Sequence, residues 1–270
     1  MIQNNISIIL VYRALKNSIF KIAFLSFLTS FIYIGHSYTI KDVFESRAVL
    51  QLSETERVQM PSLGGLGGLA SSMSGIDLSG GSDYKISLAI ERLRSRDFLN
   101  HIIKDESILN NILSEEDKSD PKKILTIAHK KYVEDILYIR QDRKSGFLNI
   151  VITHHSPDFA KSFLELIVYE LNEISRSYDF EQAQSAIDYY NKEIANTAIK
   201  DIRSAMSNLM EVQLQRKMLT NVRKDYMLQY IDSPYLPIYK SKPRRSSYAI
   251  TGFLLGFFLS ALFFIITYKD

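Results

Sequence analysis

The first group of residues that could carry chemistry is the glycine-rich run GLGGLA at Gly65–Ala70. It matches the Gly-x-Gly-x-x-Gly/Ala pattern of a dinucleotide-binding turn, in which backbone amides hold a pyrophosphate. That turn needs a strand ending directly before it and an acidic residue about 20 positions later at the end of another strand. Here the preceding strand is expected to end at Leu52, and Glu91 falls within an expected helix. The pattern therefore does not predict nucleotide binding.

A second group, His154, His155 and Asp158, has the residue types of a metal site. Adjacent residues on a strand point to opposite faces, so the two histidines cannot easily share one ion, and we expect a surface pair at a strand end. The chain has no cysteine and no phosphate-binding loop, nucleophile elbow or H-E-x-x-H sequence. We expect no catalytic residue, metal or cofactor, although an extracytoplasmic enzyme without a recognised motif stays as an alternative.

Two apolar segments near the ends of the chain are long enough to cross a bilayer. Tyr248–Thr267 runs for about twenty residues without a charge, at about 1.5 Å per residue. Residues 19–40 contain a shorter apolar run, Ile22–Gly35, behind Arg13, Lys16 and Lys21. A secretory signal peptide has the same basic start, but no A-x-A-type cleavage site follows. We therefore expect two transmembrane helices, 19–40 and 248–267.

The third group is a proline-rich basic segment directly before the second apolar stretch. Its residues are Pro234, Pro237, Lys240, Lys242, Pro243, Arg244 and Arg245. The four basic side chains suit contact with lipid phosphates or a pyrophosphate-linked glycan, and ordinary anchoring at the membrane interface is the simpler alternative. If these four basic residues are counted in the positive-inside rule, they place the central region in the cytoplasm. The positive-inside rule applies to short loops, however, so the basic tail 1–18 decides, and we expect both termini in the cytoplasm and residues 41–247 outside.

The central region reads as a small α+β domain. Val43–Leu52 is a strand candidate, and ILYIRQD and FLNIVITHH form an expected β-hairpin that pairs with it. Helices are expected from Ser82 or Asp83 through SLAIERLRSRDFLNHII, around Ile108–Leu113, and after Asp120 and Pro121. The net charge of +3 is too small for a nucleic-acid partner. The glycine-rich Pro61–Ser82 segment is either a flexible linker or a semi-ordered loop that packs on a neighbour or near the membrane.

A long helical region is expected over residues 156–231. Ser156 and Pro157 give a strong start, and no glycine or proline follows until after Ser233. Beyond Tyr178 the apolar positions thin to a narrow seam that suits helix-to-helix contact, in the same chain or between subunits: Ile187, Ile194, Ile202 and Leu209. The region is either one helix of about 100 Å or an antiparallel pair broken near Asn196 or Asn221.

Small residues are spaced for close packing in the second membrane helix. Gly252, Gly256 and Ser260 lie four residues apart, which lets two helix backbones approach each other. Ser26 and Ser30 repeat this spacing in the first helix. Glycine is also common in membrane helices without such a role. The spacing predicts packing between membrane helices, within a subunit or between subunits.

This layout resembles the Wzz family of polysaccharide co-polymerases, the chain-length determinants of O-antigen and related bacterial surface glycans. The resemblance rests on the basic tail and first membrane helix, the strand ending in LQL, the helix SLAIERLRSRDFL, the hairpin, the long helix, and the return PYLPIYKSKPRRSSYAITGFLLG. It implies an inner-membrane protein with a periplasmic α+β domain and a long extended helix, several copies of which form a ring or bell. Many relatives have a larger loop than this chain.

The function implied by the resemblance is regulation of polysaccharide length. The implied partners are further copies of the chain, a membrane polysaccharide polymerase, its lipid-linked glycan and the bilayer, with no nucleic acid. Only Tyr268, Lys269 and Asp270 follow the second apolar stretch, so no fused cytoplasmic kinase domain is expected. The alternative function is a structural adaptor of a capsule or exopolysaccharide export complex.

Overall fold

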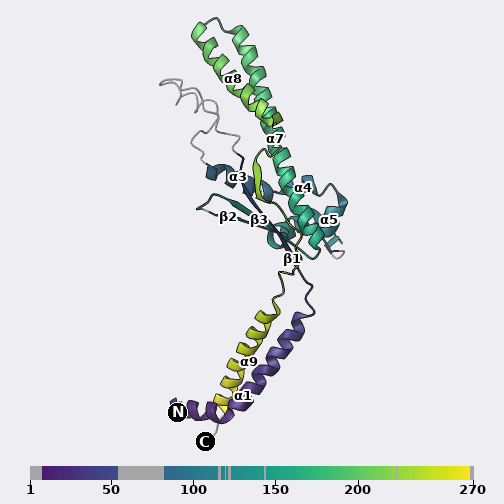
Figure 1. Ribbon diagram of the computed structural model, residues 1–270, viewed down its shortest axis with the longest axis vertical. Coiled ribbons are helices and arrows are strands. Elements are labelled where there is room, and N and C mark those ends of the chain that lie inside the picture. The colour runs from purple at the N-terminus through teal and green to yellow at the C-terminus, as the bar shows by residue number, and fades with distance from the viewer. Residues whose placement is uncertain are drawn as a thin grey trace. The chain divides into compact units, whose positions relative to one another are not determined.

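The computed structural model describes residues 8–53, 82–114, 117–118, 120, 123–142, 144–222 and 224–267 (Figure 1). The chain divides into a two-helix unit, Met1–Phe44 with Tyr239–Asp270, and an α+β unit, Glu45–Ile238. The predictions for residues 1–7, for the glycine-rich segment up to residue 81, for Pro121 and for residues 268–270 lie outside the described residues.

The two-helix unit consists of α1 (Ile8–Ser37) and α9 (Arg245–Thr267), which lie side by side in antiparallel directions (Figure 1). Ser18–Ser37 and all of α9 are long and apolar enough to cross a membrane. Only 17% of each apolar stretch is buried within the protein, so most of both surfaces is available to lipid. The helices thus begin and end within a few residues of the predicted spans, except that α1 continues back to Ile8.

The α+β unit is built on a four-stranded sheet in the order β2-β3-β1-β4. Its strands are β1 (Phe44–Leu52), β2 (Leu137–Gln141), β3 (Leu148–His154) and β4 (Leu228–Asp232). The predicted hairpin is confirmed: β2 and β3 pair antiparallel from Leu137 opposite Ile152 to Gln141 opposite Leu148. Gly146 supplies the positive φ of +73° that the turn requires.

Between β1 and β2, the residues that the structure describes form four helices and one π-helical turn. They are α3 (Ser82–Arg94), α4 (Arg96–Ile102), α5 (Glu106–Ile112), α6 (Ile124–Lys131) and η3 (Tyr132–Ile136). The first helix was expected to run on without interruption, but it breaks at Ser95. This residue takes an extended conformation, and its hydroxyl accepts a hydrogen bond from the Phe98 amide at 3.1 Å, which starts α4. The helix expected after Asp120 begins four residues later, at Ile124.

The core lies between the sheet and α7 (Pro157–Asn196). Leu50, Ile150 and Ile152 present one face of the sheet, and all three are fully buried. Phe163 and Tyr132 meet edge to face with ring centroids 6.0 Å apart. The buried Tyr132 hydroxyl donates to the Leu93 carbonyl at 2.9 Å, which satisfies its polar end.

The expected helical region 156–231 is an antiparallel pair of helices followed by a strand (Figure 1). Helix α7 starts as predicted, with the Ser156 hydroxyl accepting from the Phe159 amide at 3.3 Å, and ends at Asn196. Thr197 is extended, and α8 (Lys200–Val222) runs back along α7. The single-helix interpretation is therefore wrong, and the alternative with a break near Asn196 is confirmed.

The last part of that region, Leu228–Asp232, was also predicted to be helical and is instead β4. It pairs antiparallel with β1, from Val49 opposite Asp232 to Leu52 opposite Leu228. This strand depends on a partner far away in the sequence, so local periodicity gave no sign of it. The correction places the end of the helical hairpin at Val222.

Candidate functional site

The small residues of α9 lie against α1. Gly252, Gly256 and Ser260 are the buried residues of this helix. A Cβ atom added at Gly252 would lie 2.8 Å from the Cβ of Tyr33, and one added at Gly256 would lie 1.8 Å from the Oγ1 of Thr29. Both contacts are far below ordinary van der Waals distances, so only glycine allows this approach of the two backbones.

Hydroxyl groups of α1 also join the two helices. Thr29 donates its hydroxyl to the Gly252 carbonyl at 3.0 Å, and Ser30 donates to the Ala249 carbonyl at 2.9 Å. The buried Ser26 donates to the Ile22 carbonyl of its own helix at 2.7 Å. Polar contacts between helices cannot be replaced by water in a bilayer, and each adds about 0.6 kcal/mol to helix pairing. The pair is thus held by both close packing and hydrogen bonds, within one chain.

The segment before α9 and the first residue of α9 contact the residues that follow α1 through main-chain, ionic and cation–π interactions. Val43 and Lys242 form a β-bridge, with the Val43 amide donating to the Lys242 carbonyl at 3.0 Å. The Lys240 ammonium lies 2.8 Å from the Asp42 carboxylate. The Arg245 guanidinium stacks on the Tyr38 ring at 3.9 Å, a favourable cation–π contact.

The remaining members of the proline-rich basic segment differ in exposure. Lys242, Arg244 and Arg245 are exposed, whereas the three prolines, Pro234, Pro237 and Pro243, are buried. The Lys242–Pro243 peptide bond is cis. Cationic groups therefore face outward from a segment whose backbone is fixed by its neighbours.

The four predicted seam residues of α7 and α8 differ in burial. Ile187 is buried, and Ile194 and Leu209 are partly buried. Ile202, near the turn between the helices, is 43% exposed. Within one chain only Ile187 is fully covered, and a role of the seam in contact between subunits stays a prediction.

Two polar clusters that the sequence analysis missed fasten the hairpin to the sheet. Asp179 accepts from Arg216 of α8 at 3.0 Å and from the Tyr226 hydroxyl at 2.7 Å. Burial, together with the neighbouring Asp179 carboxylate, raises the pKa of Tyr226, which therefore stays a neutral donor. These residues come from three separate stretches of chain, and no local spacing signals their contact.

The second cluster is centred on Asn172, which is 4% exposed. Its side-chain oxygen accepts from the amides of Met227 and Leu228, each at 2.8 Å, and its side-chain nitrogen donates to the Leu228 carbonyl at 2.9 Å. The sequence did contain one indication of this cluster, because Asn172 is a polar residue within the otherwise apolar stripe of α7. The three bonds fix the chain as it enters β4.

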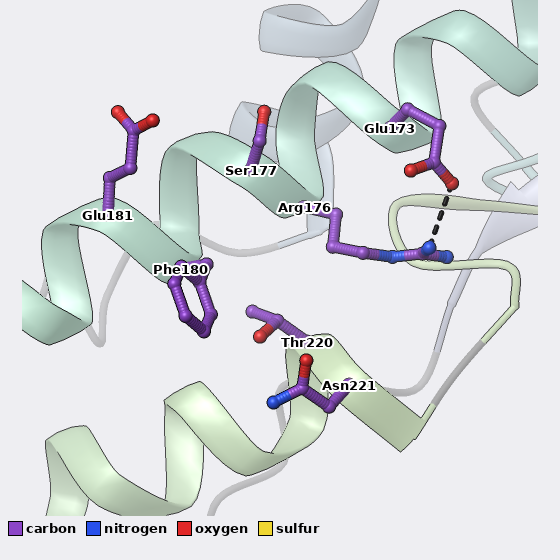
Figure 2. Close-up of a pocket in the computed structure, with 7 residues that line it drawn as sticks. All are labelled: Glu173, Arg176, Ser177, Phe180, Glu181, Thr220 and Asn221. Atoms are coloured by element: carbon purple, nitrogen blue, oxygen red, sulfur yellow. Dashed lines mark ion pairs between the residues drawn. The ribbon is translucent and has the colours of Figure 1, made fainter.

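A shallow groove of about 280 Å³ lies between α7 and the end of α8 (Figure 2). Its lining residues are Glu173, Arg176, Ser177, Phe180, Glu181, Thr220 and Asn221. Figure 2 shows the Glu173 carboxylate paired with the Arg176 guanidinium, at 2.8 Å. Arg176 also donates to the Lys224 carbonyl at 2.6 Å. The bond to Lys224 connects α7 to the segment that follows α8.

His154 and His155 lie at the end of β3, and among the described residues no group of three or more potential metal-ligand side chains is found. His154 accepts from the Ser156 amide through Nδ1 at 3.0 Å, and its Nε2 lies 3.0 Å from the Asn111 carbonyl. These partners suit the neutral ring, and burial lowers the pKa of His154. His155 is exposed, as is Asp158 in the first turn of α7.

The described residues define a class of protein: an α+β unit with a helical hairpin, preceded and followed by helices of membrane-spanning length. No family model and no curated protein matches this chain. Solved structures do. A full-length bacterial polysaccharide co-polymerase is 13% identical, with 94% of this chain and 95% of that chain covered and a TM-score of 0.40.

Two further structures are similar over about three quarters of this chain. A fragment of WzzB, a polysaccharide co-polymerase from Salmonella Typhimurium, is 14% identical, with 75% of this chain and 100% of that chain covered and a TM-score of 0.35. A Wzz dodecamer fitted to a cryo-EM map is 12% identical, with 74% and 100% covered and a TM-score of 0.27. These titles belong to the family that the layout of the sequence resembles. At such identities and TM-scores, residue roles in this chain have to be argued from its own contacts.

Proposed function

We propose that this chain is a non-enzymatic polysaccharide co-polymerase that sets the modal chain length of O-antigen or a related surface polysaccharide. The observation that carries the proposal is the pair of helices α1 and α9, joined by the glycines of α9 and the hydroxyls of α1, with an α+β unit and a helical hairpin between them. This is the layout on which the resemblance to the Wzz family rests. Such a pair fixes both ends of the central unit at one place in a membrane.

The mechanism we propose is scaffolding. Several copies assemble in the inner membrane and engage the membrane polymerase or its lipid-linked glycan. The assembly changes the balance between further extension and termination, so that one range of lengths dominates. This mechanism requires no catalytic group, and the polar clusters around Asp179 and Asn172 serve to hold the hairpin in place.

The proposed orientation places both termini in the cytoplasm and the α+β unit in the periplasm. Because the chain has no cysteine, it can be tested with single cysteines introduced one at a time. Ser145→Cys, in the exposed hairpin turn, should react with a membrane-impermeant maleimide in cells with a permeabilised outer membrane. Lys269→Cys should react only after the inner membrane is opened, and the reverse pattern would invert the topology.

We propose that the exposed Lys242, Arg244 and Arg245 contact phosphate groups, either those of lipids or the pyrophosphate of the lipid-linked glycan. Interfacial anchoring is the simpler role. Arg244→Gln separates the two, because a glycan contact predicts a shifted modal length at normal protein level. Anchoring alone predicts an unchanged mode with less protein in the membrane.

The test of the proposed function is the surface-polysaccharide ladder on a gel from cells with and without the gene. Loss of the modal cluster and its return on complementation would support length regulation. If surface glycan disappears while its length distribution stays the same, the chain is an export adaptor instead. An unchanged ladder would refute both functions.

A further inference from the structure

Large apolar side chains are exposed in the stretch of chain between β4 and α9. Four neighbouring residues point outward, and we call them the apolar patch: Tyr235, Leu236, Ile238 and Tyr239, which are 54%, 47%, 82% and 87% exposed. Pro237 between them is buried, as is Pro234 three residues earlier. A single exposed apolar side chain is ordinary, but four within five residues are typical of an interaction surface.

Contacts on both sides of the apolar patch keep it outside the core. The buried Ser46 side chain of β1 donates its hydroxyl to the Tyr235 carbonyl at 2.9 Å. On the other side of the patch, the Lys240 ammonium lies 2.8 Å from the Asp42 carboxylate. The two prolines restrict the backbone further, because each fixes its own φ at about −65°. The fold therefore holds these four side chains in an exposed position.

The apolar patch is close along the chain to a helix that can cross a membrane. Tyr239 stands six residues before Arg245, the first residue of α9. An extended chain covers at most about 3.6 Å per residue, so Tyr239 lies within about 22 Å of the start of α9. The residues that follow α1 include Tyr38 and Ile40, which are also exposed. Apolar surface thus continues beyond both helices that are long and apolar enough to cross a membrane.

The charges beside the apolar patch complement a phospholipid surface. Lys242, Arg244 and Arg245 are exposed, and no aspartate or glutamate occurs from Ser233 to Thr267. Tyrosine and aliphatic side chains favour the boundary between headgroups and acyl chains, while lysine and arginine favour the lipid phosphates. A phospholipid leaflet offers both kinds of partner in one place. For both groups of side chains to reach it, the segment has to lie along the membrane surface.

We propose that the apolar patch inserts into the headgroup region of the phospholipid leaflet at which α9 begins, with the three cations at the phosphates of that leaflet. The segment is then a third contact with the bilayer, in addition to the two helices. This goes beyond anchoring by basic residues, because it assigns burial in lipid to four side chains that the fold leaves exposed. The inference rests on the membrane location in the proposed function and does not depend on control of polysaccharide length.

The experiment uses the full-length chain, reconstituted into vesicles of phosphatidylethanolamine and phosphatidylglycerol. Because the chain has no cysteine, a thiol-reactive fluorophore reports from one introduced cysteine. Ile238→Cys carries the label in the apolar patch. Asn191→Cys, at an exposed position about 50 Å along α7 from Pro157, is the control. The label is quenched either by iodide in the water or by phospholipids brominated near the headgroup end of their acyl chains.

The label at position 238 should be quenched by the brominated lipid and protected from iodide, and the label at position 191 should show the reverse. Both labels sample the same mixture of chain orientations in the vesicles, so the ratio of their quenching does not depend on that mixture. Iodide quenching at position 238 as strong as in the control would place the patch in water and overturn the proposal. Protection from both quenchers would also overturn it, because protein then covers the patch.

A pair of double variants tests whether the side chains of the apolar patch hold the segment in lipid. With the label at Leu236→Cys, Ile238→Ser together with Tyr239→Ser should restore quenching by iodide. Ile238→Leu together with Tyr239→Phe should keep the label protected. Both pairs change only exposed side chains, so the fold is expected to be retained. Equal iodide quenching in the two double variants would overturn the proposal.

The outcome is separable from that of the proposed function. If the label at position 238 lies in water but deletion of the gene still abolishes the modal polysaccharide, the membrane contact is wrong and the function stands. If the label lies in lipid while polysaccharide length is insensitive to the gene, the membrane contact stands and the function is wrong.

Discussion

Replacing Gly256 by alanine should separate the two membrane helices. A Cβ atom at this position would lie 1.8 Å from the Thr29 Oγ1 and 2.9 Å from the Ser26 Cα. The Thr29 side chain could rotate, but its hydrogen bond to the Gly252 carbonyl would then be lost. The Ser26 Cα belongs to the backbone, so α1 itself has to move by about 0.5–1 Å to reach ordinary contact distance.

The expected cost follows from these two effects. Overpacking of a close helix contact costs about 1–3 kcal/mol, and loss of one hydrogen bond between membrane helices costs about 0.6 kcal/mol. A combined loss of about 2–3 kcal/mol corresponds to a decrease of about 30- to 150-fold in the pairing constant. Gly35→Ala is the matched control, because no atom lies within 4 Å of a Cβ added at Gly35 in α1.

The assay is an intramolecular disulfide between the helices. Phe27→Cys and Phe253→Cys replace two rings whose centroids lie 5.4 Å apart, in a chain without other cysteines. Cross-link yield is measured against the mole fraction of SDS in mixed micelles. Gly256→Ala should lower the SDS fraction at half yield, and Gly35→Ala should leave it unchanged. Equal behaviour of the two alanine variants would refute the packing argument.

Three further predictions concern the α+β unit, measured by urea denaturation of the full chain followed by circular dichroism. Asn172→Ala should lower the free energy of unfolding by about 3–5 kcal/mol, because it removes the hydrogen-bond partner of the buried Leu228 amide and carbonyl and of the part-buried Met227 amide. The control Asn191→Ala, at an exposed position of α7, should change the free energy of unfolding by less than about 0.5 kcal/mol. Asp179→Asn should lower the free energy of unfolding by about 1–2 kcal/mol, a value reduced for the partial exposure of the ion pair with Arg216. An unchanged urea midpoint would show that this cluster does not stabilise the fold. The lowered pKa of His154 means that the folded state favours the neutral ring. The stabilisation by this residue is therefore complete above about pH 6.5 and is lost as the pH falls toward the folded pKa. His154→Asn should reduce the pH dependence of the free energy of unfolding between pH 7.5 and 5, and an identical pH profile would contradict this.

Elements with strong local signals were predictable from the sequence. Ser156 followed by a proline marked the start of α7, and alternating apolar residues marked β2 and β3. The two helices that are long and apolar enough to cross a membrane followed from uninterrupted apolar length. In each case the physical cause lies within a few residues of the chain, which is why periodicity and capping chemistry were sufficient.

Elements that depend on distant contacts were not predictable in the same way. The strand β4 forms by pairing with β1 and by the hydrogen bonds of Asn172. The break after Asn196 has no glycine or proline, and the sequence alone left it as one of two alternatives. Ser95 could have been recognised as a cap, but the apolar pattern continued across it. Distant contacts form β4, whereas a local cap at Ser95 starts α4.

In the candidate site too, features set by local spacing were predictable and those set by distant contacts were not. The four-residue spacing in α9 suggested close packing, while its partner residues Thr29 and Tyr33 became visible only in the structure. The cluster of Asp179, Arg216 and Tyr226 had no sequence signal, because its members come from three separate stretches of chain. Spacing within a helix can be read from sequence, whereas the surface that the helix meets cannot.

The proposed function is control of polysaccharide length rather than of polysaccharide amount. The most direct measurement is the length profile of the surface glycan while expression of the gene is raised from zero to its natural level in a deletion strain. If the chain sets length, the ladder is unregulated at zero expression and a peak grows at one fixed length as expression rises. A total amount that rises with expression while the shape of the profile stays constant would contradict it.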